Sequence, residues 1–326
     1  MKTALGKIGF ALFAAACMAG PLQAQEYPSK PVNILLGYSP GGSGDTIARF
    51  VAEELSKALG QPFVVQNRPG AAGIIAAEAV ARSAPDGYTL LSGSSTELSA
   101  NVSVYKQLPY DPRKDFEPII QYSIQPNVLM IKAKDARLPI SSVRELVDYA
   151  KANPGKVSYG SAGNGSTQHL AMEALSMRAG VELLHVPYKG GANAIADLLG
   201  GQIDVNFSPL PEIIGHIKSG RLKALAVSSS QRSALLPDVP TMNEAGVAGY
   251  EFVGWHGLVA PAGTPKAVVD KLNAAIQKAL QNDLGRRLTE AGLTVTGGTP
   301  EQARQRLNDS IKLYGELVKA SGMPLM

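Results

Sequence analysis

Short apolar runs alternate with amphipathic segments along most of the chain. Each run is too short for a helix and is typical of a buried strand. Between the runs, apolar residues recur at helical spacing, as Ile47, Val51 and Leu55 do within 46–59. This alternation predicts an α/β fold with mainly parallel sheets. Strands are expected at 32–36, 63–65, 88–92, 157–159, 183–186, 203–207 and 222–227.

Two longer segments, around 119–131 and 250–259, have an extended pattern with no helical periodicity. We interpret them as two crossings between two α/β lobes. The first lobe is predicted to hold 25–126 plus 250–326, including the C-terminal helices, and the second lobe 127–249. Two crossings form a hinge, and the cleft between hinged lobes is a preferred place for a small ligand.

Residues 1–24 are predicted to be a cleavable export signal outside the fold. Lys2 and Lys7 precede an apolar run over 8–19, and Ala24 closes an acceptable cleavage site. The run is shorter than the ~20 residues of a membrane-spanning helix. We therefore expect cleavage after Ala24 and a periplasmic location. The alternative is a lipid anchor on Cys17, which this sequence context favours less.

Cysteine content and charge narrow the function. Cys17 is the only cysteine, so the cleaved chain has no thiol for a disulfide or a metal. Loss of Lys2 and Lys7 lowers the formal net charge from +4 to +2. A nearly balanced charge without a basic run argues against a nucleic-acid partner.

Two glycine- and serine-rich turns, at 38–45 and 159–167, each follow a strand and lead into a helix. Such turns are common as simple connections in α/β proteins. Both of these, however, combine glycine with hydroxyl or amide groups, lie at strand carboxyl ends, and lack Lys and Arg. Free N–H groups at a helix N-terminus favour an anion. We therefore predict that both turns hold one small carboxylate through backbone amides, hydroxyls and water.

The predicted ligand-binding residues come from these turns and from nearby strand ends. Glycine allows close approach of the backbone, and Ser and Thr supply donors. Asp45 is assigned chiefly to capping its helix and ordering its loop. The first-lobe residues are Tyr38, Ser39, Gly41, Gly42, Ser43, Asp45 and Ser94. The second-lobe residues are Ser161, Gly163, Asn164, Gly165, Ser166, Thr167, His169, Tyr188 and Ser208.

Enzymatic readings of the same residues are weaker. The segment 37–41 matches the G-x-S-x-G elbow and would make Ser39 the nucleophile of an exported hydrolase. Pro40 follows the serine, however, and has no N–H for an oxyanion hole. Ser43 stands where a phosphate-binding loop needs lysine. No metal or cofactor is predicted, because the histidines lack metal-ligand spacing. They are His169, His185, His216 and His256.

Several short motifs follow one another along the whole cleaved chain. They are Tyr27-Pro28, Pro40-Gly41-Gly42, Asn67-Arg68-Pro69-Gly70-Ala71, Pro85-Asp86-Gly87-Tyr88, Tyr159-Gly160-Ser161, Val186-Pro187-Tyr188-Lys189-Gly190, Gly254-Trp255 and Ala260-Pro261-Ala262-Gly263. In this order they resemble the extracytoplasmic solute-binding receptors of tripartite tricarboxylate transporters, the Bug family. The resemblance implies a type II periplasmic-binding-protein fold, capture of a small organic acid, and delivery to integral-membrane transporter subunits without catalysis.

The resemblance also implies ligand loops at 39–45 and 161–167, and a monomer is expected. The chain departs from the family pattern at Ser39 and at Asn206-Phe207-Ser208, where an aspartate often follows the aromatic residue. This second departure leaves the identity of the carboxylate open. A receptor for a signalling partner stays an alternative, because the same fold serves both roles. Trp255 is expected to be a packing residue.

Overall fold

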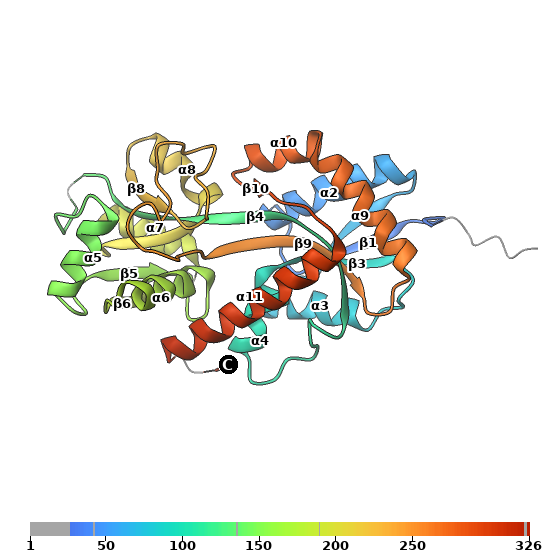
Figure 1. The fold of residues 1–326 in the computed structure, drawn as a ribbon, viewed down its shortest axis with the longest axis horizontal. Coiled ribbons are helices and arrows are strands. Elements are labelled where there is room, and N and C mark those ends of the chain that lie inside the picture. The colour runs from blue at the N-terminus through green and yellow to red at the C-terminus, as the bar shows by residue number, and fades with distance from the viewer. Residues whose placement is uncertain (1–26, 42, 135, 189, 323–324) are drawn as a thin grey trace, which may run out of the picture.

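The longest strand, β4 (Phe116–Lys132), belongs to two sheets and joins two α/β lobes (Figure 1). The computed structural model describes residues 27–41, 43–134, 136–188, 190–322 and 325–326, with the side chains of Ser43 and Ser321 left out. The predicted export signal, its cleavage site and Cys17 lie outside these residues, as does Gly42. β9 (Val253–Pro261) runs antiparallel to the first part of β4. β4 and β9 coincide with the two predicted crossings.

The first-lobe sheet has the strand order β2-β1-β3-β9-β4, and β10 pairs with β4. β1 (Val32–Leu36) is parallel to β2 (Phe63–Asn67) and β3 (Thr89–Ser94), whereas β9 is antiparallel to β3. The remaining elements of this lobe are α2 (Ser43–Leu59), η1 (Ala71–Gly73), α3 (Ile74–Ala81), η2 (Thr96–Ala100), α4 (Asn101–Val104), α9 (Lys266–Leu280), α10 (Asp283–Glu290) and β10 (Thr294–Val295).

The second-lobe sheet is built around the other end of β4. Here β4 lies between β7 (Val205–Pro209) and β8 (Leu222–Val227), antiparallel to both. β5 (Ser158–Ser161) is parallel to β7 and to β6 (Leu184–Pro187). The helices are α5 (Val143–Ala152), α6 (Thr167–Ala179), α7 (Gly191–Gly200) and α8 (Leu210–Lys218).

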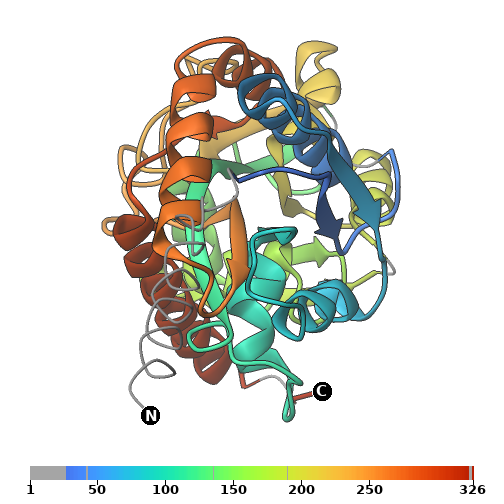
Figure 2. The same cartoon turned by 90° about the vertical axis from the view of Figure 1, so that its right-hand side faces the viewer.

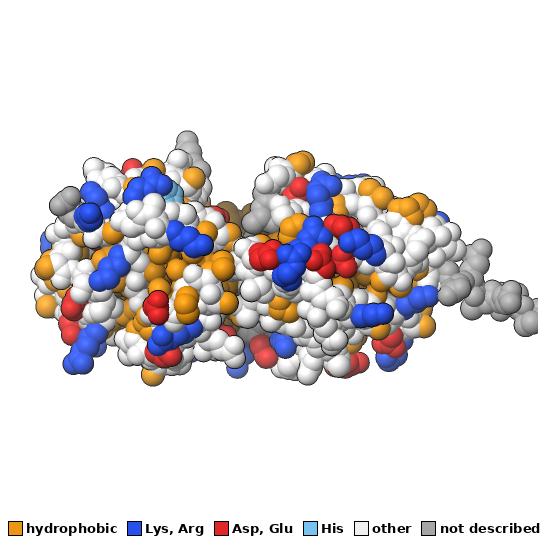
Figure 3. All heavy atoms as spheres, turned by 90° about the horizontal axis from the view of Figure 1, so that it is seen from above, with side chains coloured by type: hydrophobic (Ala, Val, Ile, Leu, Met, Phe, Trp, Pro, Cys, Tyr) orange, Lys and Arg blue, Asp and Glu red, His pale blue; other side chains and the backbone are white. Residues whose placement is uncertain are grey.

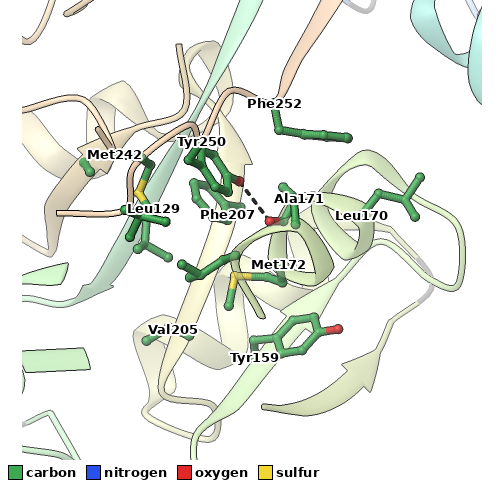
Figure 4. Packing of buried hydrophobic residues seen from close by; sticks show 14 of the residues in the cluster. Leu129, Tyr159, Leu170, Ala171, Met172, Val205, Phe207, Met242, Tyr250 and Phe252 are labelled. Atoms are coloured by element: carbon green, nitrogen blue, oxygen red, sulfur yellow. Dashed lines mark hydrogen bonds between the residues drawn. The ribbon is translucent and has the colours of Figure 1, made fainter. Parts of the chain in front are cut away.

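Helices cover both faces of each sheet, which explains why the strands are nearly continuous apolar runs. In β1, Ile34 packs towards α2 and α9, whereas Leu35 packs towards α3. Figure 2 shows helices on both sides of the first-lobe sheet. In the second lobe, Phe207 stacks on Tyr250 with ring centroids 5.8 Å apart, and the Tyr250 hydroxyl donates to the Ala171 carbonyl at 2.8 Å (Figure 4).

The C-terminal helix α11 (Pro300–Ser321) runs along both lobes (Figure 1). Thr299 starts it with a reciprocal capping box formed with Gln302. Leu307 packs with first-lobe residues, whereas Leu317 lies in the second-lobe core. The sequence predicts that this helix belongs wholly to the first lobe. Because the helix packs against both lobes, this part of the lobe boundary stays a prediction. Among the described residues, no helix has both the length and the apolarity to cross a membrane.

Candidate ligand-binding site

A cavity of about 180 Å³ lies between the lobes, above the crossing strands. Seen from above, the molecule is hollowed at this junction (Figure 3). Larger grooves of about 470 to 520 Å³ lie on other faces. We select the interlobe cavity because strand ends and helix N-termini from both lobes meet there. Its lining residues are Tyr38, Gly44, Ser94, Ser95, Thr96, Gln125, Asn127, Thr167, Pro209, Glu212, Gly254, Trp255 and His256.

Three helices begin at this cavity, and none of its lining residues that the structure describes is a lysine or an arginine. Gly44 lies in the first turn of α2, Thr167 is the first residue of α6, and Glu212 lies in the first turn of α8. The first N–H groups of a helix have no partner within it and carry the positive end of the helix dipole. The cavity therefore suits a small anion without a basic side chain.

The floor of the cavity offers a further donor at the crossing strands. Asn127 is 1 % exposed, and its Nδ2 has no hydrogen-bond partner among the described residues. Its backbone N–H donates to Ser228 Oγ at 2.9 Å, which fixes this part of β4. Because an unpaired buried amide is costly, Asn127 Nδ2 is ready to donate to a bound group.

Asp45 orders the first glycine turn. Its Oδ2 accepts from the Gly41 N–H and from Arg49 Nε, both at 3.0 Å, and its Oδ1 accepts from Asn67 Nδ2 at 2.8 Å. The Arg49 hydrogen bond is the main cause that lowers the pKa of Asp45 to about 2. The carboxylate is therefore ionised and paired. Ser39, in contrast, is exposed at the tip of this turn.

The second glycine turn uses several of its own donors internally. The Gly163 N–H donates to Ser161 Oγ, and the Gly165 N–H donates to His169 Nδ1, both at 3.1 Å. Ser166 caps α6 by accepting from the His169 N–H. Asn164 is exposed. These bonds hold the turn so that Thr167, at the helix start, reaches the cavity.

Three stacked aromatic rings lie against this turn and contact it through hydrogen bonds. The His169 and His185 rings stack with centroids 3.9 Å apart, and Tyr159 stacks on His185. His185 Nε2 lies 2.6 Å from Ser161 Oγ. Burial lowers the pKa of both histidines to about 4, so both rings are neutral at neutral pH.

Tyr38 and Ser94, at the first-lobe wall of the cavity, both hydrogen-bond to one buried carboxyl group. Glu97 is fully buried in η2. Its Oε2 lies 2.8 Å from the Tyr38 hydroxyl and 2.6 Å from Ser94 Oγ, and its Oε1 accepts from the Ser94 N–H at 2.7 Å. Burial raises the pKa of the Glu97 carboxyl. Glu97 thus fixes the hydroxyls of Tyr38 and Ser94, which line the cavity.

The structure brings three of the predicted residues to the cavity wall: Tyr38, Ser94 and Thr167. Tyr188 donates to Asp197 instead, and Ser208 is fully buried in β7 without a described partner. Their contact with a ligand stays a prediction, as it does for the rest of both turns. The sequence reasoning did not select several lining residues, which are Ser95, Thr96, Gln125, Asn127, Glu212 and His256.

Trp255 has two roles in this arrangement. It lines the cavity, and its Nε1 donates to Ser310 Oγ of α11 at 3.0 Å. Trp255 also packs in an apolar cluster with Leu307 and Ile311, as expected of a packing residue, and so links the cavity floor to α11.

Two α/β lobes with a shared strand and an interlobe cavity suited to an anion define a two-lobed solute-binding protein. Residues 47–323 match the sequence model of the family described as tripartite tricarboxylate transporter family receptor. The chain belongs to this family. The Bug-family prediction made from the short motifs is therefore confirmed.

Relatives cover nearly the whole chain. Protein BugT of Bordetella pertussis is 38 % identical over 330 residues, covering 100 % of this chain and 99 % of BugT. The solved R. palustris protein Rpa4515 with adipate has 36 % identity and a TM-score of 0.77, covering 91 % of this chain and 99 % of its own. MatC (Rpa3494) of Rhodopseudomonas palustris with bound malate has 32 % identity and a TM-score of 0.73, covering 90 % and 100 %. The expected periplasmic-binding-protein fold is thereby confirmed.

Proposed function

We propose that the protein captures a small organic carboxylate in the interlobe cavity and delivers it to the membrane subunits of a tripartite tricarboxylate transporter. One observation carries this proposal: α2, α6 and α8 all begin at a cavity whose described lining residues include no basic side chain. Backbone N–H groups and helix dipoles then supply the positive potential for an anion. The bound adipate and malate of the two solved relatives support this ligand class.

Glu212 limits which carboxylates fit. It is the one carboxylate among the described lining residues, and desolvation raises its pKa. An ionised Glu212 repels a second ligand anion at short range and accepts from a donor. We therefore place the ligand carboxylate at the helix N-termini and Asn127, with a hydroxyl, ammonium or protonated acid towards Glu212.

Binding is proposed to close the two lobes by bending at β4 and β9, the two strands that cross between them. The protein then acts as a carrier rather than a catalyst. The hydrolase alternative is weak, because Ser39 is exposed and none of the described histidines is hydrogen-bonded to it. Export with cleavage after Ala24 and a monomeric state are part of the proposal.

A thermal-shift screen tests the ligand class. We expect adipate, malate, citrate, glutamate or benzoate to raise the melting temperature, whereas the uncharged diamide of adipate leaves it unchanged. A panel without any shift would contradict the proposal. Asn127→Asp places a negative charge at the cavity floor and should reduce the shift. Asn282→Asp makes the same change at an exposed residue far from the cavity and should keep the shift.

The delivery step needs a separate test. Co-purification of the liganded protein with transporter membrane subunits is expected, whereas recovery with a sensor protein alone would favour the signalling alternative.

A further inference from the structure

Three oxygens at the first-lobe wall of the cavity form a closed triangle. The Tyr38 hydroxyl lies 2.7 Å from Ser94 Oγ, and these two lie 2.8 and 2.6 Å from Glu97 Oε2. Tyr38 and Ser94 line the cavity, whereas Glu97 lies behind them with no exposed surface. A contact this short between two oxygens is favourable when one of them donates a proton to the other.

With Glu97 ionised, the two hydroxyl protons must serve three short contacts. Both protons are then held inside the triangle, because a buried carboxylate without donors is very costly. Ser94 Oγ also accepts from the Thr96 N–H at 3.1 Å. The wall therefore presents oxygen lone pairs to the cavity, and these repel a carboxylate.

A proton on Glu97 reverses this polarity. The neutral carboxyl donates to one hydroxyl, and the chain of donors then runs outward. One hydroxyl group, of Tyr38 or Ser94, can then turn its O–H towards the cavity and donate to a ligand oxygen. The negative charge behind the wall is removed at the same time, which lowers the repulsion between Glu97 and an anion.

We propose that Glu97 is the residue that couples carboxylate binding to the uptake of one proton. This inference rests on the proposed function. Glu97 acts as a positioning residue, because it reaches the ligand through Tyr38 and Ser94. Its described partners are hydroxyl and amide groups, and no lysine or arginine among the described residues contacts its carboxyl. The burial that raises its pKa favours the protonated form.

Apart from Glu212, the other titratable groups around Glu97 keep one protonation state near neutral pH. Burial raises the pKa of Tyr38, Tyr110 and Tyr122, which interact with Glu97, and of Tyr314, and it lowers the pKa of His256 on β9 to about 4. Asp45, in the neighbouring turn, stays ionised because its pKa is about 2. Glu212, across the cavity, is the one competing carboxyl, since its pKa is raised too.

Titration calorimetry of the mature protein tests the coupling. The probe is malate, whose hydroxyl can face Glu212 without taking up a proton, or the monoamide of adipate if malate gives no thermal shift. At about pH 7.5, the apparent enthalpy is measured in several buffers of different ionisation enthalpy, and its slope gives the number of protons taken up. We expect uptake approaching one proton. We also expect Kd to rise up to about tenfold per unit between about pH 6.5 and 8.5, where the probe is fully ionised.

Two variants assign the proton. Glu97→Gln keeps a permanent donor towards the hydroxyls, so it should bind with a pH-independent Kd and no proton uptake. Glu212→Gln is the matched control and should keep the uptake. Uptake that persists in Glu97→Gln, or disappears in Glu212→Gln, would overturn the assignment to Glu97.

The wild-type series decides the question even if Glu97→Gln fails to fold, which its melting curve shows. Probe binding with no proton uptake and a flat Kd would overturn the coupling and leave the proposed function intact. Absence of binding by every acid of the screen would instead remove the proposed function itself.

Discussion

At the residue scale, Asp45 shows how one carboxylate stabilises a glycine-rich turn. Its folded pKa of about 2 lies below the ordinary 3.8, so its stabilisation is complete above about pH 5 and is lost as the pH falls towards 2. The Arg49 side chain is 51 % exposed, and solvent screens the pair. We therefore expect Asp45→Asn to lower the free energy of unfolding by about 1 kcal/mol at pH 7, and by less at pH 3.

Urea unfolding at both pH values measures this difference. Asp270→Asn removes an exposed carboxylate paired with Lys266 and should change stability much less. A difference that is the same at pH 3 and pH 7 would contradict the role of the Asp45 charge.

Gly165 offers a test of the second turn at the same scale. Its φ of +74° lies in the left-handed region, where a side chain is strained. Gly180, which ends the same helix away from the cavity, has a φ of +63°. Gly165→Ala and Gly180→Ala should each cost about 1 kcal/mol of stability. Only Gly165→Ala should weaken binding of a carboxylate in the thermal-shift screen, and equal weakening by both would argue against a binding role for this turn.

At the scale of elements, the sequence predicts what periodicity encodes. The turns at 38–45 and 159–167, the two crossings and most helices follow from strand and helix patterns with punctuating glycines. The short π-helix η2 was not predicted, because Thr96, Glu97 and Ser99 interrupt any apolar period. The polar spacing gives no sign that Glu97 is buried.

Residues that reach the cavity through pairing of distant strands were also missed. Asn127 of β4 is paired with Pro209 of β7, and His256 of β9 is paired with Ser94 of β3, the one residue of these four that was predicted. These positions are adjacent only because β4 and β9 pass between the lobes. One sequence does not specify the pairing register of these strands, so the floor of the cavity could not be predicted from it.

Helix α11 connects the two lobes at the same scale. Leu317, in its C-terminal half, is fully buried in the second-lobe core. Leu317→Ala should therefore reduce the free energy of unfolding by about 2 to 4 kcal/mol, through lost apolar contact and the cavity left behind. Lys319→Ala, at an exposed position of the same turn, should change it by less than about 0.5 kcal/mol. Denaturant unfolding measures both, and similar values would place the end of α11 outside the core.

At the scale of the whole molecule, the proposed closure would enclose a ligand in a cavity that both lobes line. The lining comes from both lobes and from the two strands that join them, so closure brings the helix N-termini of both lobes onto one ligand. α11 packs against both lobes, so the proposed closure would have to keep or repack these contacts while β4 and β9 bend.

Spin labels on the two lobes test this closure directly. Cys17 lies in the predicted export signal and is the only cysteine, so Ala58→Cys with Lys218→Cys gives one labelled position on each lobe of the mature chain. Saturating adipate should shorten and narrow the distance distribution of this pair, because the closed form binds the ligand more tightly. Ala58→Cys with Ala84→Cys places both labels on the first lobe and should show no change. If a ligand that raises the melting temperature leaves both distributions unchanged, the protein binds without closing, and delivery to the membrane must depend on another surface.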